Sequence, residues 1–309
     1  MNLQNSGQSE PGPATTSDAA AIPVPAQTPL YSALEQARYT RQDRIRQIEQ
    51  RSGRRLVCYV AGPAASINSG DIPPFVDLLD DVTEGEDLDL LLHSNGGDID
   101  QAERIIMMCR KKIGAAAAFR VIVPDSAKSA ATLIAIGADE IVMGYCSELG
   151  PIDPQVEITT ASGERMGRPA QSFLDGLEEI VNSVGGGALS PAYFPLLDKL
   201  DPALIDFCKK ALKRSQDMAS YFLQQYSLKD DPDKAEEIAK ELNNVEQYLS
   251  HGAVIDAQRA IDLGLNVRYL EPQDDLWQAF WRLYCLDRLA LESPTQRIYE
   301  GRRASLQVP

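Results

Sequence analysis

Two short segments of this 309-residue chain carry residue types that could attack a carbonyl group and stabilise the resulting negative charge. The segment HSNGGDID (93–100) holds Gly96 and Gly97, whose backbone N–H groups no Cβ atom would screen from a ligand. The segment AKSAAT holds Ser129, a hydroxyl nucleophile, followed by the amide of Ala130. Together they predict acyl transfer, with the Gly97 and Ala130 amides as an oxyanion hole. Taken singly, the glycines could form only a tight turn, and the serine only a helix N-cap.

The surrounding elements bring both segments to one edge of a sheet. Four apolar runs predict buried strands, and they alternate with three segments of helical periodicity. The strands are expected at 56–62, 88–92, 119–124 and 139–144, and the helices at 72–82, 98–111 and 129–138. This alternation predicts an α/β fold whose parallel sheet is covered on both faces. Ligands of such sheets bind beyond the carboxyl ends of the strands, where Gly97 and Ser129 are both expected.

Four segments together resemble the serine dehydrogenase proteinase family, which belongs to the Clp protease and crotonase-like superfamily and is related to signal peptide peptidase A. They are LLHSNGGDIDQAERI, AKSAATLIAIGADEIVMG, ELGPIDPQ and SHGAVIDAQRAIDLGLNV. The resemblance implies a Clp/crotonase-like parallel sheet of ββα spiral units with added helices. It also implies a serine peptidase that acts on peptides or proteins, needs no cofactor and assembles as a homo-oligomer. The chain shows no GxGxxG nucleotide loop, so redox chemistry is not expected.

The resemblance also implies which residues assist Ser129. The position 24 residues after the serine, where Clp proteases carry a histidine, is Asp153, and His251 stands just before the terminal segment, where Clp proteases carry an aspartate. The serine dehydrogenase proteinase family is described with a Ser, Asp, His triad in this order. His251 would therefore be the general base, and Asp153 would orient it. His93 has no family role, and it is expected to support the glycine loop or, with Gly96, to line the cleft.

A Ser–Lys dyad, as in signal peptide peptidase A, is the competing mechanism. It needs a lysine of lowered pKa close to the serine. The sequence has no lysine between Lys128 and Lys199, and the Lys128 side chain is expected to point away from its neighbour Ser129. The triad is therefore the favoured mechanism.

Two other classes of function remain open. A Clp-fold scaffold or interaction protein would keep the fold without turnover. A crotonase-type enzyme would use the same two amides on an acyl-CoA thioester, and it would need a glutamate base and basic residues for the CoA phosphates. The segments expected to line the site show no basic cluster, so this last class is the least favoured.

Composition narrows the function further. The formal charge of -15, from 30 Lys plus Arg and 45 Asp plus Glu, argues against nucleic-acid binding. Five widely spaced cysteines without a CxxC motif predict reduced thiols and a cytoplasmic location. With two histidines and no cysteine cluster, no metal site is expected. No apolar run approaches the ~18 residues of a membrane span, and no signal peptide is expected.

The chain divides by composition into four parts. Residues 1–29, rich in proline, are predicted to be a disordered tail, and residues 30–54 a charged N-terminal helix. Residues 55–272 are predicted to form the Clp/crotonase-like domain, with a helical insertion at about 168–249. Residues 273–309 are predicted to be a C-terminal helix and tail.

Overall fold

The structure is a computed structural model that describes residues 28–159, 163, 165–183, 201–244, 248 and 250–309. Almost all of the predicted tail 1–29 and of the glycine-rich stretch 183–191 lies outside the described residues. The chain separates into two compact units, residues 1–36 and 37–309. In the first unit, helix α1 (Pro29–Leu34) begins with a proline, at a position where a missing N–H costs no helical hydrogen bond.

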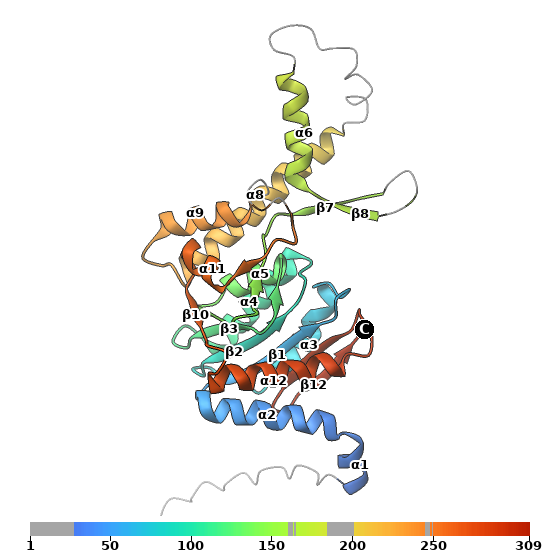
Figure 1. The fold of residues 1–309 in the computed structure, drawn as a ribbon, viewed down its shortest axis with the longest axis vertical. Helices are drawn as coiled ribbons and strands as arrows, with labels where there is room; N and C mark the ends of the chain where they lie inside the picture. Colours follow the sequence, from blue (N-terminus) through green and yellow to red (C-terminus); the bar gives the residue numbers. More distant parts are fainter. Residues whose placement is uncertain (1–27, 160–162, 164, 184–200, 245–247, 249) are drawn as a thin grey trace, which may run out of the picture. The chain divides into compact units, whose positions relative to one another are not determined.

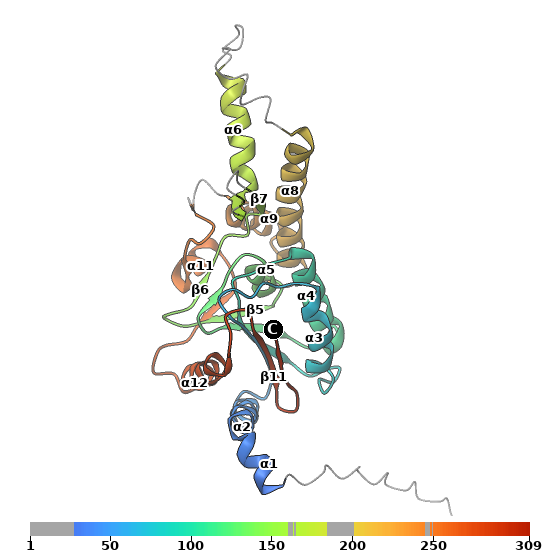
Figure 2. The same cartoon turned by 90° about the vertical axis from the view of Figure 1, so that its right-hand side faces the viewer.

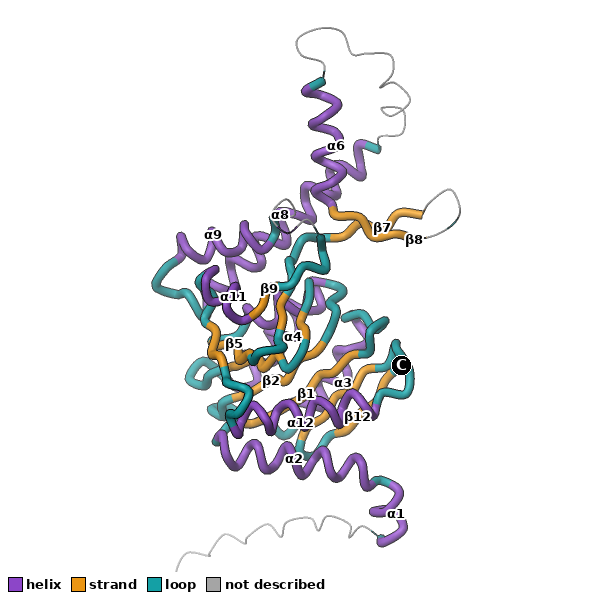
Figure 3. The backbone as a smooth tube through the Cα atoms, in the orientation of Figure 1, coloured by secondary structure: helices purple, strands orange, loops and turns teal. Residues whose placement is uncertain are grey.

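The second unit is built on a seven-stranded sheet with the order β10-β5-β3-β2-β1-β11-β12 (Figures 1 and 3). The strands are β1 (Arg55–Ala61), β2 (Leu88–His93), β3 (Phe119–Val123), β5 (Glu140–Met143), β10 (Val267–Tyr269), β11 (Arg297–Gly301) and β12 (Ser305–Val308). The five strands from β10 to β1 are parallel, and β11 and β12 extend the sheet as an antiparallel hairpin beyond β1. Four of the parallel strands are those that the apolar runs predicted.

Helices cover both faces of this sheet. On one face lie α3 (Ile72–Leu78), α4 (Ile99–Ile113) and α5 (Ala130–Ile136), and on the other lie α2 (Gln36–Ser52) and α12 (Asp275–Ala290). Figure 2 shows α3 and α4 on one side of the strands and α12 on the other. The two faces explain why the strand sequences are continuously apolar rather than alternating.

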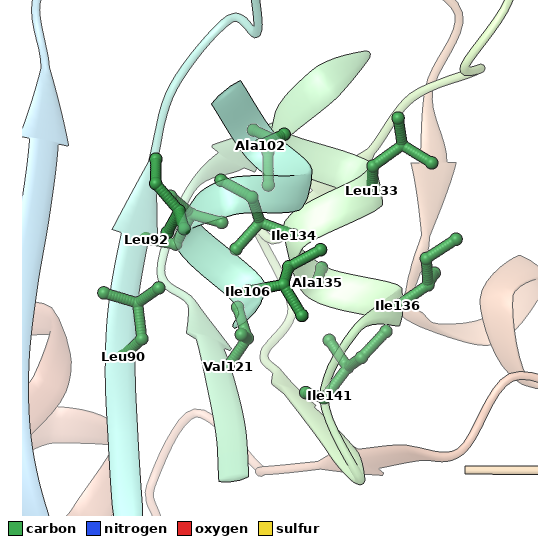
Figure 4. Close-up of a cluster of buried hydrophobic side chains, with 14 of the residues drawn as sticks. Leu90, Leu92, Ala102, Ile106, Val121, Leu133, Ile134, Ala135, Ile136 and Ile141 are labelled. Carbon is green, nitrogen blue, oxygen red and sulfur yellow. The ribbon is translucent and has the colours of Figure 1, made fainter. Parts of the chain in front are cut away.

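Strand β2 illustrates this two-sided burial. Leu90 and Leu92 point to the face covered by α4 and α5, whereas Leu91 packs against α12 on the other face. Figure 4 shows Leu90 and Leu92 beside Ile106 of α4 and Ile134 of α5. Each fully buried leucine contributes roughly 1.5–3 kcal/mol to folding, so this layer stabilises β2 in the sheet.

Shorter elements follow the sheet strands at their carboxyl ends. A second, three-stranded sheet is formed by β4 (Ser126–Ala127), β6 (Glu148–Leu149) and β9 (Ile255–Asp256), the last of which leads into α11 (Ala257–Leu263). A hairpin of β7 (Gln155–Thr159) and β8 (Arg165–Pro169) precedes α6 (Ala170–Asn182), α8 (Pro202–Gln225) and α9 (Pro232–Leu242). These three helices occupy the segment expected to be a helical insertion, and a small apolar cluster around Val156, Ala170 and Cys208 joins the hairpin to α6 and α8.

Two hairpins were not predicted from the sequence. Residues 155–170 are mostly polar and no strand was expected there, yet β7 and β8 pair in this segment. The expected C-terminal tail contains β11 and β12, with Tyr59 of β1 paired to Tyr299 of β11. The five cysteines all lie in the described part of the chain as free thiols: Cys58, Cys109 and Cys208 are buried, and Cys146 and Cys285 are half-buried.

Candidate active site

Ser129 stands at a sharp turn between a short strand and a helix. Strand β4 runs beside the exit of β2, because the Ser94 amide donates to the Ser126 carbonyl (3.1 Å) and the Lys128 amide to the Ser94 carbonyl (3.0 Å). Ser129 follows with φ 52° and ψ -119°, and it is the one described non-glycine residue with positive φ. Helix α5 then begins at Ala130. Non-glycine residues held in such conformations concentrate at functional sites.

The glycine loop after β2 packs directly against this turn. Gly96 has φ 100°, and a Cβ atom there would lie 2.8 Å from the Ser129 Cβ and 3.1 Å from the Ala130 nitrogen. Gly97 has φ 149°, and a Cβ atom there would lie 2.4 Å from the Ile67 nitrogen. Both positions therefore require glycine, since a side chain at Gly96 would push the loop away from the serine and one at Gly97 would push it away from Ile67.

Two backbone amides beside Ser129 are left without a partner. Among the described residues, the N–H groups of Gly97 and Ala130 donate no hydrogen bond, whereas the amide of Gly96 donates to the Ser94 hydroxyl (3.1 Å). Ala130 opens helix α5, so its amide is one of those that a helix leaves unsatisfied. The structure thus brings the two expected oxyanion donors to the same turn as the serine.

Asp153 and His251, 98 residues apart, are hydrogen-bonded to each other. The Asp153 Oδ1 lies 2.8 Å from the His251 Nδ1, and the second oxygen accepts a hydrogen bond from the Gln155 Nε2 at 2.7 Å. Asp153 is 2% exposed, while the His251 side chain is 29% exposed. The carboxylate is therefore fully engaged and the imidazole remains accessible.

The loop that carries Asp153 is fixed by three neighbouring elements. The Thr132 hydroxyl of α5 donates to the Gly150 carbonyl at 2.9 Å. The Ile152 amide donates to the Leu242 carbonyl at the end of α9 (2.9 Å), and the Ser215 hydroxyl of α8 donates to the Ile152 carbonyl (2.8 Å). The helical segment after residue 170 thus helps to position the carboxylate, which gives it a role in the site.

One cleft of about 520 Å³ collects these parts. Ser129, His251, Gly96 and Gly97 line this cleft. The rest of its lining includes the segment 63–66, two residues of β7 (Gln155 and Glu157) and two residues of α8 (Phe207 and Ala211). The described residues that line the cleft include no lysine and no arginine. Nor do the described residues contain a group of three or more His, Cys, Asp or Glu that could hold a metal ion.

His93 lies outside the cleft. It is not among the described residues that line it, and its Nδ1 lies 3.3 Å from the Ser126 amide and 3.4 Å from the Tyr284 hydroxyl. Burial lowers the pKa of His93 to about 4, against the opposing effect of the Asp125 carboxylate. His93 is thus a neutral acceptor that holds Ser126, in the segment leading to Ser129, and the expectation that it lines the cleft is wrong.

The Lys128 ammonium is held by three partners on neighbouring segments. Its ammonium donates to the Leu149 carbonyl (3.1 Å) and the Ala253 carbonyl (3.1 Å), and it forms an ion pair with Glu148 at 3.0 Å. These three acceptors match the three N–H groups that an ammonium can donate.

Sequence reasoning overlooked Gln155 and the wall segment 63–66. The proximity of Gln155 to Asp153, two residues earlier, was the available signal, because alternate residues of an extended chain share a face. The segment 63–66 follows the end of β1, at the same sheet edge as the glycine loop, so its position was predictable from the strand although its residues, Pro-Ala-Ala-Ser, suggest no chemistry.

A family model of ClpP-like serine proteinases matches part of this chain. The matching family is the ClpP-like SDH-type serine proteinase family, whose model spans residues 31–167. This match confirms the resemblance drawn from the sequence and the α/β, Clp/crotonase-like fold class. It includes Ser129 and Asp153 and ends before His251. Similarity to a serine proteinase family supports a peptidase function.

Two uncharacterized proteins of Methanocaldococcus jannaschii are related to the chain. One is 27% identical over 74% of this chain and 72% of its own length, and the other is 33% identical over 60% and 55%. Among solved structures, two mutants of the 1510-N membrane-bound stomatin-specific protease, one of them in complex with a substrate peptide, align with 17% and 18% identity. They cover 71% and 75% of this chain and 99% of their own, with TM-scores of 0.36 and 0.34. Among the described residues, no helix is long and apolar enough to cross a membrane.

Proposed function

We propose that this chain is a serine peptidase that cleaves peptide bonds through an acyl-enzyme on Ser129. The observation that carries the proposal is one cleft lined by Ser129, the glycine loop and the His251 ring. The Nδ1 of this ring is bonded to the buried carboxylate of Asp153. Proximity of a nucleophile, a base and a group that orients the base is the arrangement acyl transfer requires.

The pairing of His251 assigns a task to each ring nitrogen. Because Nδ1 lies 2.8 Å from the Asp153 carboxylate, Nδ1 carries the proton and Nε2 is left as the acceptor. Nε2 takes the Ser129 hydroxyl proton while Oγ bonds to the scissile carbonyl carbon. The imidazolium then returns that proton to the leaving amine as the C–N bond breaks. Water repeats the sequence on the ester and releases the acid.

The free amides of Gly97 and Ala130 would receive the carbonyl oxygen as it becomes an oxyanion. Both donors belong to a backbone that is already fixed, so no reorganisation accompanies the build-up of charge. Removing one such donor typically costs about 10²–10³ in kcat, which sets the scale of their contribution.

The contacts of Lys128 support the triad over a Ser–Lys dyad. Its ammonium is committed to two carbonyls and Glu148, whereas His251 faces the cleft. The absence of lysine and arginine among the described cleft residues likewise disfavours an acyl-CoA substrate, whose phosphates would need basic partners.

Labelling with a fluorophosphonate tests the proposal. We expect stoichiometric labelling of the full-length chain, located at Ser129 by peptide mass spectrometry, and its loss in Ser129→Ala. Ser220→Ala on α8 is the matched control, because that serine lies outside the cleft and should leave labelling unchanged. If the wild-type chain is folded and Ser129 remains unlabelled, the hydrolase is excluded and a scaffold with this fold is favoured instead.

A further inference from the structure

A buried carboxylate behind the cleft connects the C-terminal hairpin to the glycine loop. Asp71 is fully buried at the start of α3. Its partners lie on β1, on β11 and on the segment 62–68, which we call the cleft wall because residues 63–66 line the cleft.

The cleft wall is bonded directly to the glycine loop. The Ile67 amide donates to the Gly96 carbonyl (2.8 Å), the Asp98 amide donates to the Ile67 carbonyl (2.9 Å), and the Asn95 side chain donates to the Pro63 carbonyl (2.9 Å). These bonds flank the peptide of Gly97 on both sides. Where the wall lies therefore decides where the Gly97 N–H points.

Asp71 holds the wall from behind. Its Oδ2 accepts from the Asn68 amide at 2.6 Å, and its Oδ1 accepts from the Tyr299 hydroxyl, with the Tyr59 hydroxyl and an Arg297 nitrogen each at 3.4 Å. Burial raises the pKa of both tyrosines, so each phenol keeps the proton that it donates.

The C-terminal segment also reaches the wall without Asp71. The Gly62 amide donates to the Gln296 carbonyl (2.8 Å), the Ala64 amide to the Pro294 carbonyl (2.8 Å), and Arg297 to the Ser66 carbonyl (3.2 Å). The wall is thus held between the glycine loop on one side and the residues entering β11 on the other.

We propose that Asp71, Tyr299 and Arg297 are positioning residues that fix the Gly97 amide through the cleft wall. The C-terminal hairpin, outside the 31–167 segment that matches the family, is then part of the active-site architecture. This inference rests on the proposed function for its catalytic consequence. The mechanical coupling itself, from Tyr299 to the glycine loop, does not depend on catalysis.

Tyr299→Phe is the most direct variant, because it removes one hydroxyl and keeps the ring that packs against Tyr59 and Phe75. With the Asp71 carboxylate short of a donor, the wall loosens. We expect kcat to fall about tenfold, a fraction of the loss of a whole oxyanion donor, while KM changes less than about twofold. Asp71→Asn should lower kcat further, by about 10²-fold.

Arg302→Gln provides the matched control on the same hairpin. Arg302 lies in the turn after β11 and pairs with Asp81 and Glu49, away from Asp71. It should show wild-type kcat and KM even if the melting temperature falls.

Hydrogen exchange of the full-length chain tests the coupling of Tyr299 to the glycine loop independently of the proposed peptidase function. The Asp98 amide, bonded to Ile67, should exchange faster in Tyr299→Phe than in wild type or Arg302→Gln. If wild type is not labelled at Ser129, the proposed function fails while exchange still decides the coupling. If Tyr299→Phe melts at a lower temperature but keeps wild-type kcat and wild-type exchange at residues 94–98, the network is only structural and our inference is overturned.

Discussion

The molecule contains two histidine–aspartate pairs, and burial is arranged in opposite ways in them. In the pair at the cleft, Asp153 is 2% exposed and the His251 side chain 29% exposed, with 2.8 Å between the carboxylate and the imidazole. In the other pair the His93 side chain is 9% exposed and the Asp125 side chain 43%, at 3.7 Å. Each pair joins the same two residue types, so their different environments must account for any difference in behaviour.

A buried aspartate with an accessible histidine can orient and stabilise an imidazolium that exchanges protons with a ligand. A buried histidine with an accessible aspartate cannot, because burial lowers the pKa of His93 to about 4 and keeps the ring neutral. His93, although it stands three residues from the glycine pair, therefore has the environment of a structural residue. His251, remote in sequence, has the accessible ring and the buried carboxylate partner that our proposal requires of a base.

Substitutions that break the Asp153–His251 pair should lower kcat more than any other change considered. In Asp153→Asn the amide can no longer hold the Nδ1 proton and stabilise the imidazolium, and kcat should fall about 10⁴-fold. His251→Gln should lose at least as much. Peptide turnover and the rate of fluorophosphonate labelling of Ser129 are the measurements.

His93→Asn is the matched change in the buried pair, since an amide oxygen can accept from the Ser126 amide as Nδ1 does. It should keep kcat within about tenfold of wild type, because no proton passes through it. Equal losses of kcat in His93→Asn and His251→Gln would erase the distinction between the two pairs.

A smaller effect concerns stability in acid. The pKa of His93 is lowered from 6.5 to about 4 by folding, so below pH 6.5 the unfolded chain takes up a proton that the folded chain refuses. The free energy of unfolding should therefore decrease as pH falls from about 6.5 to about 4, by up to about 3 kcal/mol, and change no further from this group below that.

Urea unfolding at several pH values measures this dependence, and comparison with His93→Asn isolates it from the carboxylates. The variant should show a flatter profile between pH 6.5 and 4. Parallel profiles for the two proteins would mean that His93 titrates normally in the folded state.

The smallest loss of kcat is expected for Gln155, whose Nε2 donates to the second oxygen of Asp153 at 2.7 Å. Gln155→Leu leaves that buried oxygen unpaired, at a cost of about 1–3 kcal/mol. Because some of that cost is relieved by water from the cleft, we expect kcat to drop about fivefold to tenfold. Glu157→Gln, two residues along the same strand and also lining the cleft, is the control and should keep kcat near wild type.

The central sheet was predictable because short apolar runs in the sequence indicate its strands. The runs 88–92 and 119–124 are apolar without interruption, since both faces are covered, and β2 and β3 occupy nearly those residues. Helix α5 follows Ser129 as its small apolar residues indicated. The proximity of the glycine pair and the serine followed from the rule that parallel strands end at one edge.

The hairpin β11–β12 was not predictable in the same way. Arg297 and Glu300 read as solvent-exposed charges, yet both are buried, because Asp71 and Arg41 supply their partners from more than 200 residues away. A local pattern contains no trace of such distant pairing. The pairing of Asp153 with His251 was likewise reached through a family resemblance, since their spacing of 98 residues carries no signal.

The backbone of Ser129 carries a consequence for the history of this sequence. Its φ of 52° and ψ of -119° are costly for a residue with a Cβ atom, of the order of 1–3 kcal/mol, and nearly free for glycine. Mutation toward stability would replace this serine with glycine, so only selection for a hydroxyl would retain it. A relative with glycine at this position would then mark a lineage that gave up turnover and gained stability.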